Sequence, residues 1–230
     1  LHYPLRRQRQ MCIRDSWQTV WIEPLPDICF DRLKITPDVD ASEIQVEVAL
    51  SGEIGGTDLQ VGMTLKDGSE IVSDVVCDIG QTAYLQIKKP QLWSPENPHL
   101  YDLRLQLMNG EQILDSVDSY CALRKYSLVR DLNGYLRFAL NDQPIFLYGP
   151  LDQGYFPDGL YTPPNEAAML FDIEFTREIG CNLIRKHVKV EPARWYYHCD
   201  RLGMIVWQDM PNGGLPDQPW QATLSIALGY

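Results

Sequence analysis

Polar and charged side chains follow directly on two short apolar segments in the carboxyl-terminal half of the sequence. Arg185, Lys186 and His187 follow an apolar pair in "CNLIRKHVKVEP", and Gln208 and Asp209 follow another in "MIVWQDMP". In sheets of parallel strands, ligands bind at the carboxyl ends of the strands, where such residues are placed. These positions are therefore candidates for a binding or catalytic site.

A second interpretation of the same residues is structural. Arg185 and His187 lie two positions apart and share one face of a strand. They could instead make buried hydrogen bonds or ion pairs that hold neighbouring strands together, for example between Arg185 and Asp209. The residues alone leave both interpretations open.

The segment before these residues has helical periodicity. The stretch "TPPNEAAMLFDIEFTREIG" predicts a helix, because residues spaced four, three and three apart form one face: Met169, Ile173, Thr176 and Ile179. Thr162 or Asn165 is the expected cap, and Gly180 ends the helix. Glu174 and Glu178 lie one turn apart on the face expected to contact solvent.

A second helix is predicted between the two apolar segments. In "EPARWYYHCDRLG", Pro192 lies near the first turn, Trp195, Cys199 and Leu202 share a face, and Gly203 ends the helix. Strands that alternate with helices through short connections pair in parallel. The region after position 141 is therefore predicted to be an α/β unit.

From Trp17 to about Leu140 the apolar period is two instead. "EIQVEVAL" and "YDLRLQLMNGEQIL" alternate apolar and polar residues, as half-buried strands do. Asn109-Gly110, Lys66-Asp67-Gly68 and Asn133-Gly134 are turn sequences typical of hairpins. This pattern predicts an antiparallel β-sandwich of the immunoglobulin type.

Composition excludes several classes of function. The chain has 230 residues, is 45% hydrophobic and carries a formal charge of -11, which argues against binding to nucleic acid phosphates. It has no apolar run long enough to span a membrane, so we expect a soluble protein that is not membrane-bound. The six cysteines form no C-x-x-C pair, and the adjacent His198, Cys199 and Asp200 diverge on a helix. We expect neither a metal nor a cofactor.

The first sixteen residues differ from the rest. "LHYPLRRQRQMCIRDS" contains four arginines and one acidic residue, whereas the whole chain is acidic. It is either a native basic arm or foreign sequence, and "MCIRDS" resembles translated adapter sequence. We therefore predict a non-native or disordered leader over residues 1–16.

Four stretches of the sequence resemble glycoside hydrolase family 2, which includes β-galactosidases, β-glucuronidases and β-mannosidases. "WQTVWIEPLP" resembles the exit from the jelly-roll domain of that family, and "LWSPENPHLYDLRLQL" its immunoglobulin-like middle domain. "LNDQPIFLYG" (140–149) is similar to the first barrel strand, and residues 172–212 resemble the next two βα units. The resemblance implies an immunoglobulin-like domain over 17–124 and, over 125–230, the first three βα units of an incomplete (β/α)8 barrel.

The same resemblance implies roles for four residues in binding a carbohydrate substrate. Arg185 matches an arginine that supports the catalytic carboxylates, and His187 is similar to a histidine that contacts sugar hydroxyls. Asp209 resembles an acid after the third strand in the mannosidase-like branch. Asp152 is expected in the loop after the first strand, but the surrounding "GPLDQGYFPDG" lacks the Asn-Arg-His pattern of the family, which leaves the sugar undefined.

Retaining glycoside hydrolysis requires two carboxyl groups about 5–5.5 Å apart. In this family the acid/base follows an asparagine on a later barrel strand, but the Asn165-Glu166 pair of this chain is placed to begin a helix. Residues 141–230 amount to 90 positions, against about 250 for a whole barrel. We therefore predict that both catalytic carboxylates are missing.

The sequence is thus expected to be an inactive fragment of a retaining, exo-acting β-glycoside hydrolase. The parent would add a jelly-roll domain and the rest of the barrel. The alternative is a non-catalytic carbohydrate-binding or domain-interaction module with a remnant barrel. The compartment, periplasmic or cytoplasmic, is left open.

Overall fold

A computed structural model describes residues 22–52, 58–210 and 225–226 of the chain. The predicted leader over residues 1–16, the next five residues and positions 211–212 of the proposed βα region lie outside the described residues. None of the helices in the described part of the chain has the length and apolar character needed to cross a membrane.

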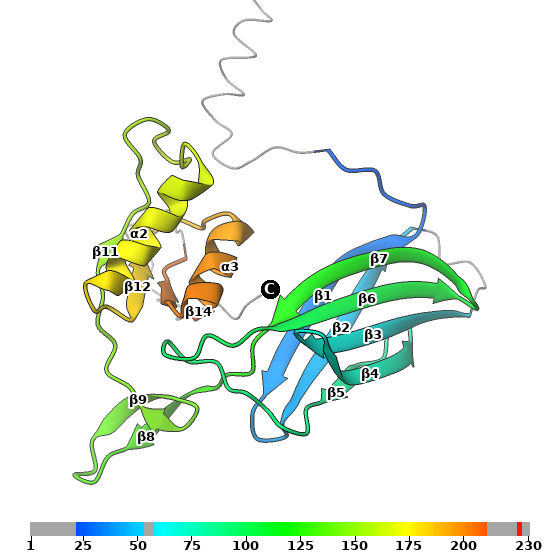
Figure 1. The fold of residues 1–230 in the computed structure, drawn as a ribbon, viewed down its shortest axis with the longest axis horizontal. Coiled ribbons are helices and arrows are strands. Elements are labelled where there is room, and N and C mark those ends of the chain that lie inside the picture. Colours follow the sequence, from blue (N-terminus) through cyan, green and yellow to red (C-terminus); the bar gives the residue numbers. More distant parts are fainter. Residues whose placement is uncertain (1–21, 53–57, 211–224, 227–230) are drawn as a thin grey trace, which may run out of the picture.

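The amino-terminal half consists of two antiparallel sheets, which we call the two-sheet module (Figure 1). Its first sheet has the order β1-β2-β5: β1 (Cys29–Asp38), β2 (Glu43–Ser51) and β5 (Ala83–Gln86). Its second sheet has the order β4-β3-β6-β7: β4 (Glu70–Asp78), β3 (Leu59–Asp67), β6 (Tyr101–Asn109) and β7 (Gln112–Cys121).

The alternating residues of these strands meet in one core between the two sheets. Ile44 and Val46 of β2 pack in the same buried cluster as Met63 of β3 and Leu103 and Leu105 of β6. Each of these side chains is at most 1% exposed. The hydrophobic burial that holds the two sheets together therefore follows from the period-two pattern of the sequence.

All three predicted turn sequences join antiparallel strands. Lys66-Asp67-Gly68 ends β3 and begins the turn to β4, and Asn109-Gly110 ends β6 and begins the turn to β7. Asn133-Gly134 joins β8 (Tyr126–Arg130) to β9 (Leu136–Leu140), which pairs in turn with the two-residue β10 (Gln143–Pro144). The three hairpin predictions are confirmed.

The carboxyl-terminal half contains a parallel sheet with two helices, which we call the parallel module. Its elements are β11 (Leu151–Asp152), α2 (Glu166–Glu178), β12 (Leu183–Lys186), α3 (Ala193–Leu202) and β13 (Ile205–Gln208). β11 pairs in parallel with β12, and β12 pairs in parallel with β13. The predicted parallel pairing is thus confirmed.

Alternate residues of the parallel sheet face two different cores. Ile184 and Val206 pack against α2 and α3, together with Ile173 and Trp195 of the helices. Leu183, Ile205 and their neighbours face the opposite way, toward the β8–β9 hairpin and Trp93 of the two-sheet module. The polar residues that follow continue this alternation, so Arg185 lies on the same face as Leu183, and Lys186 lies on the same face as Ile184.

Three details differ from the sequence predictions. Residues 140–149 do not form one strand: β9 ends at Leu140, β10 covers Gln143–Pro144, and β11 begins at Leu151, although the Leu183 N–H of β12 already donates to the Tyr148 carbonyl at 3.2 Å. Asp152 lies within β11 and not in the loop after the first strand. Ile179 ends α2 as its C-cap and is 56% exposed. β14 (Ser225–Ile226) pairs antiparallel with β13, which departs from an all-parallel sheet.

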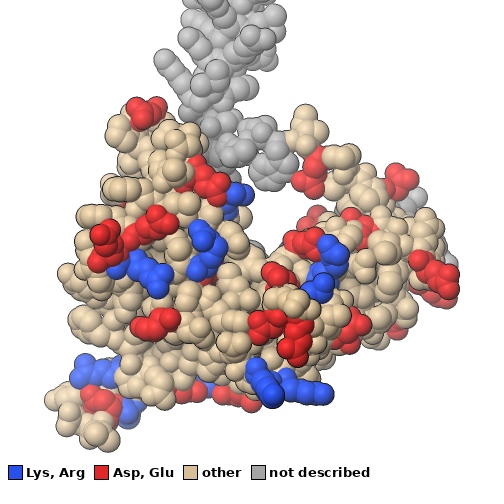
Figure 2. Space-filling model, viewed as in Figure 1, with Lys and Arg blue, Asp and Glu red and all other residues tan. Residues whose placement is uncertain are grey.

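The helix ends follow ordinary capping chemistry. The Asn165 side chain accepts a hydrogen bond of 2.8 Å from the Ala168 N–H, so Asn165 and not Thr162 is the N-cap of α2. Gly203 ends α3 with a φ of 75°, a conformation that glycine adopts at little cost. On the face shown in Figure 2, basic and acidic side chains lie interspersed over both modules.

Candidate functional site

The carboxyl ends of β11, β12 and β13 meet at one edge of the parallel module. Asp152 lies beside Lys186, and Lys186 lies beside Gln208 in the strand register. The four predicted site residues occupy the ends of these strands or the next position along the chain. We call this cluster of Asp152, Arg185, His187 and Asp209 the carboxyl edge.

Arg185 and Asp209 form an ion pair across the ends of β12 and β13. Arg185 Nη2 lies 2.9 Å, and its Nε 3.2 Å, from Oδ2 of Asp209. The two side chains are 48% and 20% exposed. The ion pair of the structural interpretation therefore exists, but it is open to solvent rather than sealed in a core, so the guanidinium retains N–H groups for a ligand.

His187 lies next to the end of β11. Its backbone N–H donates a hydrogen bond of 2.8 Å to the Asp152 carbonyl. Its ring Nδ1 lies 3.2 Å from the Gln153 side-chain nitrogen. Because an amide nitrogen donates, Nδ1 is the acceptor in this contact. The structure thus brings His187 and Asp152 together, as it does Arg185 and Asp209.

Sequence reasoning missed a group of buried charges directly behind the carboxyl edge. Lys186 and Lys189 are each 1% exposed as residues, and Glu191 is 4% exposed. Lys186 pairs with the carboxylates of Asp152 and Glu191, and Lys189 pairs with Glu191. We call Asp152, Lys186, Lys189 and Glu191 the buried lysine cluster. The alternation along β12 does place Lys186 on the helix-facing side, but lysines are rarely found buried there.

The end of β13 is held by a second set of polar contacts. The Gln208 side-chain nitrogen donates to the carbonyls of Lys189 and Asp209, at 2.8 and 2.7 Å. The Tyr196 hydroxyl donates to the Gln208 side-chain oxygen and accepts a hydrogen bond of 3.1 Å from the Glu191 N–H. Since α3 carries Tyr196, this helix fixes the backbone that carries Asp209.

Gly154 has no room for a side chain, which gives a first test of the packing here. Its φ is +66°, and an added Cβ would lie 2.4 Å from Glu191 Oε1 and 2.8 Å from Lys189 Nζ. We expect Gly154→Ala to lower the free energy of unfolding by about 2–4 kcal/mol, from left-handed strain and overpacking together.

Gly134→Ala is the matched control for this variant. Gly134 also has a positive φ, +81°, but an added Cβ would meet nothing within 4 Å. It should cost only the conformational strain, about 1–2 kcal/mol. Urea unfolding of both variants measures the difference, and equal losses would show that the space around Gly154 is not tightly filled.

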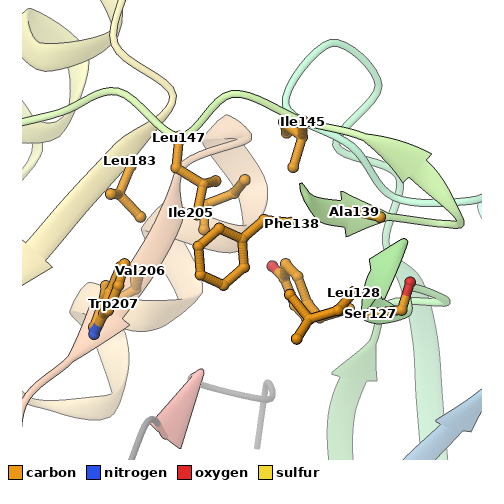
Figure 3. A pocket seen from close by; sticks show the side chains of 11 residues that line it. Ser127, Leu128, Phe138, Ala139, Ile145, Leu147, Leu183, Ile205, Val206 and Trp207 are labelled. Carbon is orange, nitrogen blue, oxygen red and sulfur yellow. The ribbon is translucent and has the colours of Figure 1, made fainter. Parts of the chain in front are cut away.

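The structure also contains an apolar cavity, whose lining includes Trp207, the register partner of Arg185, but none of the four residues of the carboxyl edge. It has a volume of about 250 Å³ and lies between the β8–β9 hairpin and the parallel sheet (Figure 3). Leu128, Phe138, Leu183, Ile205 and Trp207 are among its lining residues. A sugar needs several polar partners, so this cavity is a poor candidate for a sugar site.

Comparison with known proteins relates the two-sheet module to a family of enzymes. Residues 28–124, which include all seven strands of the module, match the family model described as "Glycosyl hydrolases family 2". A putative β-glucuronidase of Formosa agariphila is 28% identical over 218 residues, which cover 91% of this chain and 26% of that protein. A β-galactosidase of Leuconostoc mesenteroides is 27% identical over 192 residues, 75% of this chain and 17% of that protein.

A solved structure has a similar fold. The crystal structure of the Ruminococcus gnavus β-glucuronidase matches with a TM-score of 0.69 at 22% identity, over 81% of this chain and 30% of that one. At that identity the match concerns the fold alone. The chain spans about a quarter or less of the length of the two curated relatives named above.

Proposed function

We propose that this chain is part of a longer, retaining, exo-acting β-glycoside hydrolase of glycosyl hydrolase family 2, because residues 28–124 match the model of that family. In this proposal the two-sheet module is the immunoglobulin-like domain and the parallel module begins a (β/α)8 barrel. The similar fold of the β-glucuronidase structure and the parallel pairing of β11, β12 and β13 support it. The longer protein would add a jelly-roll domain and the remaining barrel strands.

The observation that carries the proposal is the solvent-open pair of Arg185 and Asp209 beside His187. Carboxylate, guanidinium and imidazole groups together both accept from and donate to sugar hydroxyls. In a barrel they would line the mouth, where substrates bind. We assign Asp152, Arg185, His187 and Asp209 to the binding of a carbohydrate substrate.

Three carboxylates at or near the carboxyl edge have other partners, which supports placing the catalytic pair elsewhere. Asp209 is paired with Arg185, and Asp152 with Lys186. Glu166 binds Arg194 at the start of α2, where it also suits the helix dipole. Retaining hydrolysis needs one carboxyl group as acid and base and a second as nucleophile. Both would come from barrel strands beyond this chain.

Arg185 has a defined part in such a mechanism. Its charge would hold a neighbouring nucleophilic carboxylate in the ionised form and orient it toward the anomeric carbon. Asp209 fixes the orientation of the planar guanidinium through its contacts with Nε and Nη2. The proposed substrates are β-linked pyranosides, since the named relatives are β-glucuronidases and β-galactosidases.

The proposal predicts that the purified 230-residue chain does not hydrolyse aryl β-glycosides, because it places both catalytic carboxylates on later barrel strands. The same chain joined to the downstream coding sequence of its gene is expected to release the aryl group. A colorimetric assay against aryl β-galactoside, β-glucuronide, β-mannoside and β-glucoside measures both forms. Turnover by the chain alone that persists after further purification would contradict the missing carboxylates. An extended protein that binds sugars without cleaving them would favour the non-catalytic module.

A further inference from the structure

Two lysine side chains are buried side by side directly behind the carboxyl edge. Lys186 Nζ contacts the Asp152 carboxylate, lies 2.8 Å from Glu191 Oε1, and sits 4.4 Å from the centre of the Trp195 ring. Lys189 Nζ donates to the carbonyls of Gly154 and Tyr161, each at 2.7 Å, and lies 2.9 Å from Glu191 Oε1. Both ammonium groups thus have a complete set of partners.

The partners of Lys189 come from a distant loop. Gly154 and Tyr161 lie in the connection between β11 and α2, whereas Lys189 lies between β12 and α3. An ammonium group has three N–H donors, and two of them hold this connection from the inside. Lys189 therefore joins the loops that leave the carboxyl ends of two adjacent strands.

Stability alone is a weak explanation for this cluster. Removing an ammonium group from water is costly, and apolar residues of similar size often stabilise a core at least as well as a buried ion pair. What an apolar residue cannot do is fix a carboxylate and two carbonyls at defined positions. The cluster instead fixes the position of the Asp152 carboxylate. This carboxylate also accepts a 2.6 Å hydrogen bond from the Gly154 N–H.

The backbone beside the cluster is strained in a way that fits this role. Val188 has a φ of 50°, a left-handed conformation that β-branched residues rarely adopt. This turn lets His187 remain at the carboxyl edge while Lys189 enters the interior. Strain of this kind persists only where the surrounding contacts determine the conformation, and the contacts of Lys189 supply them here.

We infer that Lys186 and Lys189 are positioning residues, which hold Asp152, Gln153 and His187 in place for sugar binding without touching the sugar. Lys186 orients the Asp152 carboxylate, and Lys189 holds the loop of Gly154 and Tyr161 against the end of β12. The positioning of the loop follows from the hydrogen bonds that Lys189 makes to Gly154 and Tyr161 in this chain. The consequence for sugar binding rests on the proposed function.

The loop is tested by hydrogen exchange in the 230-residue chain. Lys189→Met preserves length and removes the donors, so the amides of Gly154, Phe156 and Leu160 should exchange at least about tenfold faster. Phe156 and Leu160 are suitable reporters because their amides bond to each other's carbonyls within this loop. Lys125→Met, which removes an exposed partner of Asp40 and Asp142, should leave these rates unchanged.

A second variant covers the case in which Lys189→Met does not fold. Combining it with Glu191→Gln removes one positive and one negative charge, so the cluster stays neutral while the carbonyls of Gly154 and Tyr161 still lose their donor. Faster exchange in the loop is again expected. Rates equal to wild type in whichever variant folds would overturn the inference.

The functional half is tested by steady-state kinetics of the extended enzyme on an aryl β-glycoside. If Lys189 positions binding groups, Lys189→Met should raise KM about tenfold and change kcat less than threefold. A purely structural lysine would lower the active fraction, and hence kcat, at unchanged KM, and that result would overturn the role in binding. If the extended wild-type enzyme cleaves no β-glycoside, the proposed function and the role in sugar binding both fail, while hydrogen exchange still decides the positioning of the loop.

Discussion

Replacing Asp200 by alanine is expected to lower the free energy of unfolding by about 3–5 kcal/mol, because it leaves a buried guanidinium without its carboxylate. Arg124 Nη1 lies 2.6 Å from Asp200 Oδ1, and the two side chains are only 4% and 8% exposed. Arg124 follows β7 of the two-sheet module, whereas Asp200 lies in α3. The pair thus joins the two modules.

Other groups converge on the same residue. The Trp93 indole N–H donates 2.7 Å to the Asp200 carbonyl, and the Tyr120 hydroxyl donates 3.0 Å to its Oδ2. Burial, and next the negative charge of Asp200, raises the pKa of Tyr120 far above its usual range, so this hydroxyl remains a donor. The Arg124 guanidinium also lies 4.5 Å from the centre of the Trp93 ring. Asp200→Ala removes the carboxylate that accepts from both Arg124 and Tyr120, whereas the backbone carbonyl that accepts from Trp93 remains.

Urea unfolding followed by circular dichroism measures this prediction. Asp118→Ala is the control, because it removes the exposed partner of Arg104 on the outer surface of the second sheet and should change stability little. If Asp200→Ala yields no folded protein, Asp200→Asn preserves the shape and should still be clearly destabilised. A midpoint for the Asp200 variants equal to wild type would show that the pair does not hold the modules together.

The position of Asp200 gives α3 two tasks at once. Near its amino end, Trp195 and Tyr196 contact Lys186 and Gln208 behind the carboxyl edge. Near its carboxyl end, Asp200 binds the two-sheet module. The helix α3 therefore connects the two-sheet module to the strand ends of the parallel module.

Much of this fold could be predicted from local sequence patterns. Alternating apolar residues predicted the strands of the two-sheet module, and turn sequences such as Asn109-Gly110 predicted its hairpins. The expected cap of α2 was Thr162 or Asn165, and the structure shows that Asn165 is the cap, because its side chain accepts from the Ala168 N–H. These features depend on neighbours within a few residues, which a single sequence contains.

The features that escaped prediction depend on partners far along the chain. The sequence around Lys189 gives no sign that this lysine is buried. Its burial depends on a hydrogen bond to the carbonyl of Gly154, which lies 35 positions away in the chain. The Arg124–Asp200 pair spans 76 positions. The resemblance implied a first barrel strand over residues 140–149, but Gln143–Pro144 pair with β9 as β10, and β11 begins only at Leu151. At the carboxyl edge the residues could be identified, whereas the buried cluster that supports them could not.

Replacing Arg185 by alanine is expected to remove most activity from the extended enzyme while preserving its fold. The guanidinium is 48% exposed and its partner Asp209 is 20% exposed, so water can solvate the remaining carboxylate and little stability is lost. Loss of a fixed positive charge beside a reacting carboxylate costs about 10²–10³-fold in rate, or roughly 2.7–4 kcal/mol of transition-state stabilisation. Arg185→Lys should recover only part of this, since an ammonium cannot make the two-point contact with Asp209.

Lys125→Ala serves as the control, because Lys125 lies in an exposed ion pair away from the carboxyl edge. It should leave kcat/KM unchanged, and the unfolding midpoints of all variants should match that of the wild type. A loss of activity that accompanies a loss of folded protein would be attributed to stability and not to the site.

The most direct measurement is kcat/KM of the extended enzyme with Arg185→Ala, on the aryl β-glycoside that the wild type cleaves best. A fall of about 10²-fold or more at an unchanged unfolding midpoint is the predicted result. A value within about threefold of wild type would mean that the pair of Arg185 and Asp209 only closes the sheet, and that the sugar binds elsewhere.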